Sequence, residues 1–369
     1  MNITFIIQNY NYQGGGQVIA NLIEKFNTCG HFTKVIVIRC SKYDKQSRPK
    51  LKHDVLDLNA SNFISGVLKL ISIFKTSNDA FISIGGYSNL SAGLAKIISR
   101  SSVKIIGSEH FAKSPLLGDY SKFILRLCLP LFKLSYSRLN GLIFVSENLR
   151  LKFLKKNQWH PTRCKTIYNP VRFHIKQKNN IDYKKVNSGI TFLGIGVLET
   201  RKRFDILLRA FSLVASSNDQ LLIAGTGSLK TNLKILSKTL KIESQVRFLD
   251  YISDVESLLK KSDILVLTSN SEAFGMVLAE GLSQGLQVVS TNCFSGPSEV
   301  LNHGKYGFLA EVDNINSVAS AMKSAITNPI PAGVIYEGAS RFDSDLISKK
   351  YLQFIEKISN QNGGINDKL

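Results

Sequence analysis

Short apolar runs, separated by segments with helical periodicity, recur along the whole chain. In the first half these runs cover residues 2–10, 34–40, 54–59, 80–86, 103–109, 141–146 and 165–168. In the second half they cover residues 190–196, 221–225, 246–251, 263–268 and 286–291. Apolar runs of this length that alternate with amphipathic segments are typical of parallel strands in repeated βα units. The pattern therefore predicts an α/β fold built on parallel sheets.

Length and composition divide this pattern into two domains. The chain has 369 residues, more than one typical domain, and residues 174–189 are polar and rich in Lys and Asn, as expected of a linker. We expect a first domain over residues 1–173 and a second over residues 190–340. A final helix at residues 341–358 is expected to pack back on the first domain, and residues 359–369 to fray.

The apolar run at residues 263–268 leads directly into a segment with helix-start chemistry, because Asn270 or Ser271 can cap a helix. A helix that begins straight after a parallel strand directs its N–H groups to the carboxyl edge of the sheet. Open α/β folds bind ligands at that edge, and helix N-termini attract anions. The N–H groups predicted to bind an anion are those of Phe274, Gly275 and Met276.

Two glutamates flank this predicted anion site. Glu272 lies at its mouth, and Glu280 lies about two turns further along the expected helix. Ionised carboxylates only accept hydrogen bonds, so both side chains can bind hydroxyl groups on either side of a phosphate. A sugar nucleotide has this arrangement of hydroxyl, phosphate and hydroxyl groups. The alternative is that Glu272 caps the helix and Glu280 is solvated, because charged side chains are usually exposed.

Two further segments carry candidate anion ligands. Gln13–Gln17 contains three consecutive glycines between a predicted strand and a predicted helix, and such a turn either cradles a phosphate or serves tight packing alone. Arg201, Lys202 and Arg203 are consecutive cations before an amphipathic helix, where positive charge opposes the helix dipole. A bound anion would relieve this conflict.

The order of these motifs resembles the donor-site signature of glycosyltransferase family 4, in chains of the bacterial surface-polysaccharide type. The matching residues are Ser271-Glu272-Ala273-Phe274-Gly275, Glu280, Gly285, Val288-Val289-Ser290-Thr291 and Gly296-Pro297-Ser298-Glu299. They follow one another over an ordered strand, loop, helix, strand and turn. The resemblance implies the GT-B fold, in which two Rossmann-like parallel-sheet domains face each other across a cleft, and a transfer that retains anomeric configuration.

The resemblance also implies roles for the acidic residues. Glu272 would bind sugar hydroxyls, Glu280 the ribose hydroxyls, and Glu299 would shape the sugar pocket. His110, which follows the run at 103–109, falls where the family often has a His near the sugar or its acceptor; a lone His is equally compatible with a structural role. Other donor-binding residues implied by the resemblance are Gly15, Gly16, Gly225, Tyr251, Ile252, Phe274, Gly275 and Met276.

One departure from the family concerns the cations that bind the donor diphosphate. The family has an Arg and, five residues later, a Lys. In this chain the Lys matches Lys202, but the Arg position holds Val197. The resemblance therefore implies Glu272, Lys202 and His110 as catalytic residues, with Arg201 or Arg203 as the substitute for the missing Arg.

The net charge of +20 is concentrated in the first half of the chain. Residues 1–188 contain 29 Lys and Arg against 9 Asp and Glu, whereas residues 189–369 contain 18 of each kind. This asymmetry predicts an anionic partner for the first half, either nucleic acid or an acidic membrane surface. Residues 122–133 mix basic, apolar and aromatic residues, so they are expected either to lie on anionic lipid or to pack in the core with solvated lysines.

Composition limits the chemistry and the compartment. The five cysteines are scattered along the sequence, which favours a reducing compartment and indicates neither a disulfide framework nor a metal site. The start of the sequence has no basic leader, and no uncharged run reaches membrane-spanning length. We expect a cytoplasmic protein that is peripheral on the inner face of the cell membrane.

The resemblance, together with these observations, implies a retaining hexosyltransferase. It would move a hexose or N-acetylhexosamine from a nucleoside-diphosphate sugar, UDP-linked by preference, to a polyprenyl-diphosphate-linked or other glycan acceptor in O-antigen, capsule or lipopolysaccharide biosynthesis. A nucleoside diphosphate leaves as an anion, so cations and a helix N-terminus suffice without a metal or other cofactor. The alternatives are a nucleic-acid-binding protein, although we find no compact motif for that role, and a sugar-nucleotide epimerase on the same fold.

Overall fold

The computed structural model describes residues 1–10, 14–39, 53–110, 122–173, 175 and 189–360. These residues form two compact units. Unit 1 comprises Met1–Pro170 and Ser344–Leu369, and unit 2 comprises Val171–Asp343. The first boundary between the units thus follows Pro170, where we expected it after residue 173. The second precedes Ser344, where we expected it before residue 341. The linker expected at 174–189 lies almost entirely outside the described residues.

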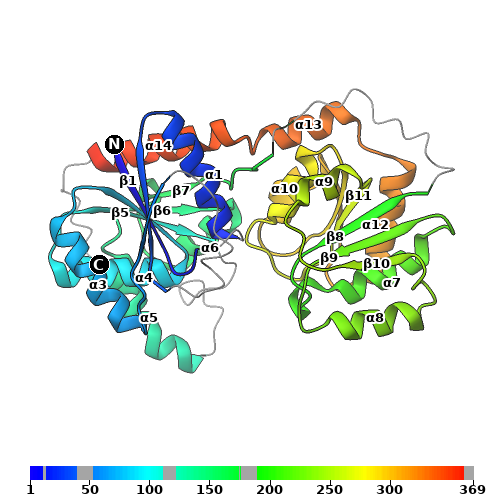
Figure 1. Cartoon of the computed structure of the whole chain (residues 1–369), viewed down its shortest axis with the longest axis horizontal. Helices are drawn as coiled ribbons and strands as arrows, with labels where there is room; N and C mark the ends of the chain where they lie inside the picture. The colour runs from blue at the N-terminus through cyan, green and yellow to red at the C-terminus, as the bar shows by residue number, and fades with distance from the viewer. Residues whose placement is uncertain (11–13, 40–52, 111–121, 174, 176–188, 361–369) are drawn as a thin grey trace. The chain divides into compact units, whose positions relative to one another are not determined.

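Unit 1 is built on a seven-stranded parallel sheet with the order β3-β2-β1-β4-β5-β6-β7 (Figure 1). Its strands are β1 (Asn2–Ile7), β2 (Phe32–Val37), β3 (Asp54–Asp57), β4 (Ala80–Ile84), β5 (Lys104–Glu109), β6 (Gly141–Phe144) and β7 (Cys164–Thr166). Its helices are α1 (Gly15–Thr28), α3 (Phe63–Thr76), α4 (Gly86–Ser99), α5 (Lys122–Tyr136), α6 (Glu147–Lys156), the short η2 (Pro161–Arg163) and α14 (Ser344–Asn360).

Unit 2 is built on a six-stranded parallel sheet with the order β10-β9-β8-β11-β12-β13. Its strands are β8 (Thr191–Ile195), β9 (Gln220–Ala224), β10 (Val246–Leu249), β11 (Ile264–Leu267), β12 (Gln287–Thr291) and β13 (Phe308–Ala310). Its helices are η4 (Thr200–Lys202), α7 (Phe204–Val214), α8 (Lys230–Thr239), α9 (Val255–Lys260), α10 (Met276–Ser283), α11 (Pro297–Val300), η5 (Asn302–Gly304), α12 (Ile315–Thr327) and α13 (Ala332–Ser340).

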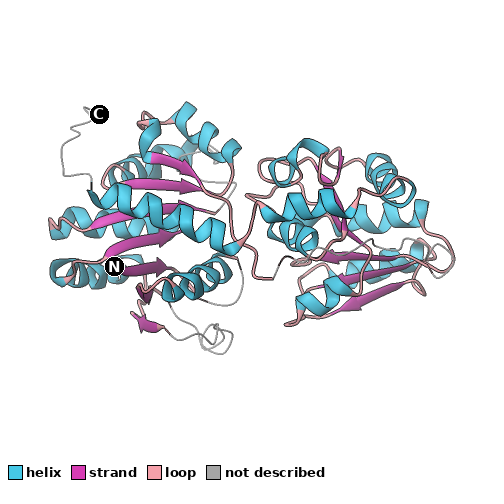
Figure 2. Ribbon diagram, turned by 90° about the horizontal axis from the view of Figure 1, so that it is seen from above, coloured by secondary structure: helices cyan, strands magenta, loops and turns pink. Residues whose placement is uncertain are grey.

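Helices cover both faces of each sheet (Figure 2), which explains why the strands are apolar throughout rather than alternating. In β1, for example, Ile3, Phe5 and Ile6 are fully buried although successive side chains point to opposite faces. In unit 2, Phe192 of β8 and Phe211 of α7 pack edge to face with ring centroids 5.5 Å apart, within an apolar core between the sheet and the helices α7 and α12.

Most strands end earlier than the apolar runs that predicted them; β5 and β12 end at Glu109 and Thr291, as predicted. The run at residues 80–86, for example, corresponds to β4 at Ala80–Ile84, because Gly85 takes a left-handed backbone conformation (φ 84°) that starts α4. The residues that follow the strands therefore form loops at the carboxyl edge of the sheet.

The final helix, α14, groups with unit 1, where it runs beside α1 (Figure 1). Lys25 of α1 forms an ion pair of 2.8 Å with Asp345 at the start of α14. Phe354 and Ile358 lie so close to Gly141 of β6 that an added Cβ there would be 3.0 Å and 3.2 Å from them. In the described part of the chain, no helix is both long and apolar enough to span a bilayer.

The direction of chain progression reverses between β1 and β4 in unit 1 and between β8 and β11 in unit 2. In open parallel sheets such a reversal leaves room for a ligand beyond the carboxyl ends of the two strands. The loops after β1, β4, β8 and β11 therefore border the positions at which a ligand would bind.

Candidate functional site

The segments after β8 and β11 come together at the reversal point in unit 2. Thr268 ends the β11 segment and donates its hydroxyl to the carbonyl oxygens of Lys202 (3.0 Å) and Arg203 (2.8 Å). The backbone N–H of Asn270 donates to the carbonyl oxygen of Arg201 at 3.0 Å. These bonds fix the three consecutive cations against the loop that carries Glu272.

Lys202 and Glu272 form the centre of the site. Lys202 Nζ lies 2.6 Å from Glu272 Oε1, and only 14% of the lysine side chain and 11% of the glutamate side chain are exposed. Arg201 Nη1 lies 3.1 Å from the same oxygen and 2.8 Å from the carbonyl oxygen of Ser271, with its side chain 47% exposed. Ser269 donates its hydroxyl to Glu272 Oε1 at 2.7 Å.

Opposing effects act on the pKa of Glu272. Burial raises the pKa, but the charge and hydrogen bond of Lys202, followed by the charge of Arg201, outweigh burial and leave the pKa below its usual range. All the hydrogen bonds just described to the Glu272 carboxylate go to Oε1, so Oε2 keeps its lone pairs among the described residues. The carboxylate is therefore ionised at neutral pH and can accept further hydrogen bonds.

Arg201 and Arg203 point to different partners, although both are candidates for the missing Arg. Arg203 donates to Asp205 at 3.1 Å and 3.0 Å and also pairs with Asp313. Its charge is thus already balanced by two carboxylates. Val197, in the position of the family's Arg, is 45% exposed. Arg201 contacts Glu272, whereas Arg203 does not. The geometry therefore favours Arg201 as the substitute for the family's Arg.

The loop that carries Glu272 differs from the predicted helix. We expected a helix capped by Asn270 or Ser271, with Glu272 in its first turn, but α10 begins at Met276 after the left-handed Gly275 (φ 90°). Glu272 instead pairs in an extended conformation with Ser295, whose N–H donates to the Glu272 carbonyl oxygen at 2.6 Å. The prediction that Glu272 and Glu280 lie along one helix is therefore wrong, because the backbone of Glu272 bonds to another loop.

The remaining predicted residues of unit 2 surround this loop. Glu280 on α10 is 6% exposed and Glu299 on α11 is 7% exposed, so neither is a solvated carboxylate. Phe274 is 3% exposed and packs edge to face on Phe342 with a centroid distance of 5.4 Å, so its side chain has a packing role. Met276 contributes its N–H to the first turn of α10.

Gly225 is required by close packing of backbones. It follows β9, and an added Cβ would lie 1.9 Å from the carbonyl oxygen of Gly196, which follows β8. Gly196 in turn leaves room for Lys202, whose Cε would be 3.2 Å from an added Cβ. Further along, Tyr251 is 51% exposed and Ile252 is half-buried in the loop after β10.

The predicted residues of unit 1 lie at the carboxyl edge of its own sheet. Gly15 is the first residue of α1 and packs on Ile84, whose Cγ2 would be 2.9 Å from an added Cβ; Gly16 is buried beside it. His110 follows β5 and shares a 2.9 Å hydrogen bond between its Nε2 and the Ser108 hydroxyl. Burial lowers the pKa of His110 to about 4, so the ring is neutral at physiological pH.

Sequence reasoning missed two parts of these sites. Ser269 follows an apolar strand and carries no distinguishing signal, yet it binds the Glu272 carboxylate. Next to His110, the buried Glu109 accepts hydrogen bonds from the Tyr136 hydroxyl and, at 2.7 Å, from Asn89 Nδ2. Burial raises the pKa of Glu109 in spite of these bonds. The network joins β5 to α4 and α5, and sequence spacing alone does not bring these residues together.

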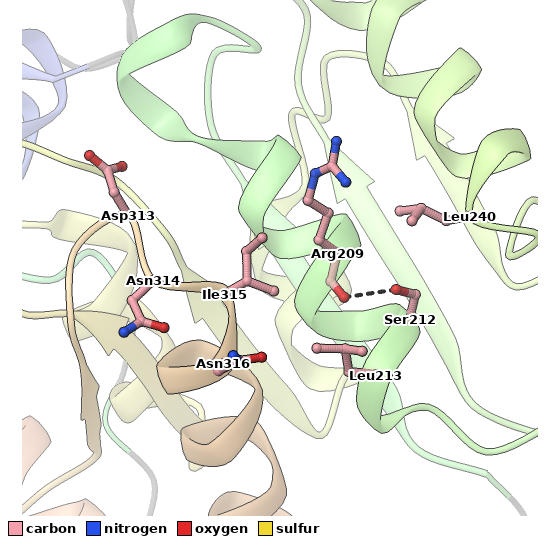
Figure 3. A pocket seen from close by; sticks show the side chains of 8 residues that line it. All are labelled: Arg209, Ser212, Leu213, Leu240, Asp313, Asn314, Ile315 and Asn316. Atoms are coloured by element: carbon pink, nitrogen blue, oxygen red, sulfur yellow. Dashed lines mark hydrogen bonds between the residues drawn. The ribbon is translucent and has the colours of Figure 1, made fainter.

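A shallow pocket of about 530 Å³ lies elsewhere on unit 2, between α7 and the start of α12 (Figure 3). Its lining residues are Arg209, Ser212, Leu213, Leu240, Asp313, Asn314, Ile315 and Asn316. They include none of the predicted site residues. In the described residues no group of three His, Cys, Asp or Glu side chains is arranged to hold a metal ion, and metal independence stays a prediction.

Comparison with known families places a match in unit 2. A family model described as "Glycosyl transferases group 1" matches residues 175–342. An uncharacterized glycosyltransferase of Haemophilus influenzae is 35% identical over 141 residues, which are 38% of this chain and 40% of that protein.

A second relative has a named reaction. The N-acetylgalactosamine-N,N'-diacetylbacillosaminyl-diphospho-undecaprenol 4-alpha-N-acetylgalactosaminyltransferase of Campylobacter jejuni is 31% identical over 167 residues, 45% of each protein. The chain thus spans less than half the length of the two curated relatives.

Solved structures match both units. The apo form of the lipopolysaccharide outer core galactosyltransferase WaaB gives a TM-score of 0.76 at 21% identity, covering 97% of this chain and 99% of that one. HepE from Anabaena, in complex with UDP, gives 0.78 at 19% identity, covering 97% and 100%. At such identities the likeness shows the fold alone. The chain therefore has the GT-B fold of these glycosyltransferases, and residues 175–342 match the glycosyl transferases group 1 model.

Proposed function

We propose that the protein is a retaining glycosyltransferase that moves a hexose or N-acetylhexosamine from a nucleoside-diphosphate sugar to a lipid-linked glycan precursor of a surface polysaccharide. The observation that carries this proposal is the Lys202–Glu272 ion pair with Arg201 beside it. It lies where ligands bind in open α/β sheets, and within the residues that match the glycosyltransferase family model.

The cations suit the departure of a nucleoside diphosphate. As the sugar–oxygen bond breaks, negative charge develops on the diphosphate, and groups already aimed at that charge lower the barrier most. Lys202 and Arg201 supply two positive charges, and the first N–H groups of α10 supply a partial one. In this mechanism a protonated acid is not required, because the leaving group is stable as an anion.

Glu272 has a double role in the proposal. Through Oε1 it holds Lys202 and Arg201 in place, and through Oε2 it can accept a hydrogen bond from a sugar hydroxyl. The low pKa keeps it an acceptor at neutral pH. Glu280 would bind the ribose and Glu299 would shape the sugar pocket, with Tyr251 and Ile252 beside the base. On unit 1, neutral His110 would act near the sugar or acceptor, and Gly15 and Gly16 would admit the substrate close to the backbone.

The donor nucleotide and the acceptor are proposed from the relatives. HepE was solved in complex with UDP, which supports UDP as the nucleotide. The name of the Campylobacter jejuni relative includes a diphospho-undecaprenol acceptor, which supports a polyprenyl-diphosphate-linked glycan. Such an acceptor is anchored in a membrane, so the proposal includes peripheral binding of the protein to the inner face of the cell membrane.

Nucleotide release from a panel of nucleotide sugars tests the activity. The protein should release UDP from at least one UDP-hexose or UDP-N-acetylhexosamine, and release should rise when an undecaprenyl-diphosphate-linked glycan is added. NMR of the product should show the anomeric configuration of the donor. Without release from any donor in the presence of such acceptors, the transferase proposal fails. Conversion of the donor sugar without nucleotide release would instead indicate an epimerase.

A further inference from the structure

The start of α4 leaves several hydrogen-bond donors without acceptors. Gly85, the residue before the helix, has a φ of 84° and provides no capping side chain, and the first turn contains no acidic residue. The N–H groups of Gly86, Tyr87 and Ser88 are too early in the helix to have an intrahelical acceptor, and within the described residues they donate to no other group. The helix has 14 residues, so its dipole adds partial positive charge at this turn.

Ser88 adds an unpartnered hydroxyl to the same turn. Its side chain is fully buried (0% exposed), yet its Oγ has no hydrogen-bond partner in the part of the chain that the structure describes. Because Cα–Cβ bonds in a helix tilt toward the N-terminus, this hydroxyl is directed to the end at which the free N–H groups lie. Native structures rarely keep a buried polar group without a partner, since it costs free energy. A ligand that accepts hydrogen bonds from both the hydroxyl and the N–H groups would satisfy them together.

This turn lies at the carboxyl edge of the unit 1 sheet, where chain progression reverses between β1 and β4. Gly85 N–H donates to the carbonyl oxygen of Ser108 at 2.8 Å, and the Ser108 hydroxyl shares a hydrogen bond of 2.9 Å with His110 Nε2. An added Cβ at Gly15 would be 2.9 Å from Cγ2 of Ile84, the residue before Gly85. The start of α4 therefore lies between the predicted glycine turn, which follows β1, and His110, which follows β5.

Glu109, whose carboxyl group is hydrogen-bonded to α4, does not satisfy these donors. Its Oε1 accepts hydrogen bonds from the Tyr136 hydroxyl and, at 2.7 Å, from Asn89 Nδ2. None of the three free N–H groups among the described residues donates to it. Burial raises the pKa of Glu109 in spite of its hydrogen bonds, which favours the neutral acid over the carboxylate. Glu109 therefore opposes an anion at this turn less than an ordinary carboxylate would.

We propose that the first turn of α4 binds a phosphate-type oxyanion through the N–H groups of Gly86, Tyr87 and Ser88 and through the Ser88 hydroxyl. Backbone N–H groups at a helix start suit phosphate oxygens in both geometry and charge. The oxyanion can belong to the diphosphate of a lipid-linked acceptor or to a free phosphate compound. The first source rests on the proposed function, whereas the binding chemistry does not. The site uses no residue of unit 2, which contains the proposed donor cations.

The structural alternative is that water satisfies this turn. Gly86 and Tyr87 are half-buried, so water can reach the start of the helix, and the Ser88 hydroxyl would then be an unsatisfied group that the fold tolerates. Under this alternative, removal of the hydroxyl changes no binding property. Under the proposal, the same change weakens binding of the oxyanion without destabilising the free protein.

The test variant is Ser88→Ala, and Ser91→Ala from the same helix is its matched control. Ser91 is also fully buried, but its hydroxyl donates to the carbonyl oxygen of Tyr87 at 2.9 Å. Without ligand, the melting temperature should fall in Ser91→Ala, which loses a hydrogen bond, and stay equal or rise in Ser88→Ala, which loses an unsatisfied group. Cooperative melting of both variants shows that they are folded before binding is measured.

Isothermal titration calorimetry measures binding of two probes. One is inorganic pyrophosphate, with sodium chloride of equal ionic strength as the reference, and the other is undecaprenyl diphosphate in detergent micelles, with empty micelles as the reference. We expect saturable binding of at least one probe. Its affinity should fall about tenfold in Ser88→Ala, the loss expected for one hydrogen bond to a charged group, and change less than about twofold in Ser91→Ala. Repeating the titrations with Lys202→Ala added to each protein separates any pyrophosphate bound by the unit 2 cations.

Binding of undecaprenyl diphosphate that depends on Ser88 would support the site and identify a lipid-linked acceptor as the source of the oxyanion. Binding of pyrophosphate alone, with the same dependence, would support the site and identify a free phosphate compound. The inference is overturned if neither probe binds saturably, or if the wild type and Ser88→Ala bind both probes equally.

Kinetics separates a failure of this inference from a failure of the proposed function. Without nucleotide release from any donor, the proposed function fails, but the binding measurements above keep their meaning. With an active acceptor, Ser88→Ala should raise the acceptor KM about tenfold and leave the donor KM unchanged. An unchanged acceptor KM would overturn the assignment of the oxyanion to the acceptor, although the transferase activity itself would stand.

Discussion

Among single residues, Glu272 and Glu280 of unit 2 have separable roles in the proposed reaction. Glu272→Ala removes the partner of Lys202 and the acceptor for a sugar hydroxyl, so kcat should fall by about a hundredfold or more. Glu280→Ala, further along α10, should mainly raise the donor KM. Steady-state kinetics with the active donor measures both. Full activity in Glu272→Ala would show that the site is assigned wrongly.

The three consecutive cations should differ in their effect on activity. Lys202→Ala should cost about 2–4 kcal/mol in kcat/KM, because it removes a charged contact to the diphosphate. Arg201→Ala should cost less, since its side chain is half exposed. Arg203→Ala should lower the melting temperature but hardly change kcat/KM, because its partners are Asp205 and Asp313. If Arg203→Ala is instead the most damaging to kcat/KM, Arg203 replaces the family's Arg.

The lowered pKa of the half-buried His110 should make stability depend on pH. Its pKa is about 4 in the folded protein and 6.5 in the unfolded chain, so between these values the unfolded chain binds more protons. The folded state should therefore lose stability as the pH falls from 6.5 to 4. The melting temperature of His110→Gln should fall less over this range than that of the wild type. Equal falls in both proteins would show that His110 titrates normally.

Among the secondary-structure elements, the start of α11 restrains the loop before α10. An added Cβ at Gly296 would lie 2.3 Å from the Cα of Phe274, so Gly296→Ala must displace that backbone. We expect a loss of about 1–3 kcal/mol in unfolding free energy and a fall in activity, because Glu272 is in the same loop. The control is Gly333→Ala in α13, where an added Cβ meets nothing within 4 Å and should be neutral or stabilising. Urea denaturation compares the two variants.

The sequence predicts the larger elements well because their signal is local. Strands buried on both faces are apolar throughout, and the order of apolar runs implied the parallel sheets that the structure contains. The three-residue β13 (Phe308–Ala310) was missed because it is too short to form a recognisable run. The ends of most strands other than β5 and β12 were placed too late, since apolar residues continue into the loops.

The site was less predictable because its contacts are not local. Lys202 and Glu272 are 70 residues apart and meet because β8 and β11 are neighbours in the sheet. Asn270 and Ser271 have the chemistry of helix caps, yet the pairing of Glu272 with Ser295 holds this loop extended. The family resemblance supplied roles for these residues. The pairing of Arg203 with Asp205 and Asp313, which separates it from Arg201, is evident only from the structure.

For the whole molecule, the charge asymmetry should produce membrane binding through unit 1. All twenty excess charges lie before residue 189, in a stretch that belongs mostly to unit 1. Each basic residue near an anionic leaflet contributes about 1 kcal/mol. On α5, Leu131 and Leu134 are 42% and 49% exposed and can add apolar contact. Of the apolar residues expected to insert, Phe132 is half-buried, and the side chains of Phe123 and Leu127 lie outside the described residues.

Co-sedimentation with anionic vesicles at rising salt tests this prediction. Binding should appear at low salt, fade as ions screen the charges, and weaken in Lys122/Arg126/Lys133→Gln. The variant Lys234/Lys238/Lys241→Gln removes three exposed charges from unit 2 and should bind like the wild type. Equal binding to neutral vesicles, or no binding to anionic ones, would contradict membrane docking.

The position of α14 in unit 1 has a consequence for synthesis on the ribosome. Unit 2 is one continuous segment, Val171–Asp343, so all of it emerges before α14 does. Translation of unit 1 therefore begins first but is completed last. Until α14 is made, β6 is not covered by Phe354 and Ile358. A nascent chain that terminates anywhere within unit 2 would leave that apolar surface of unit 1 open to aggregation and to chaperones.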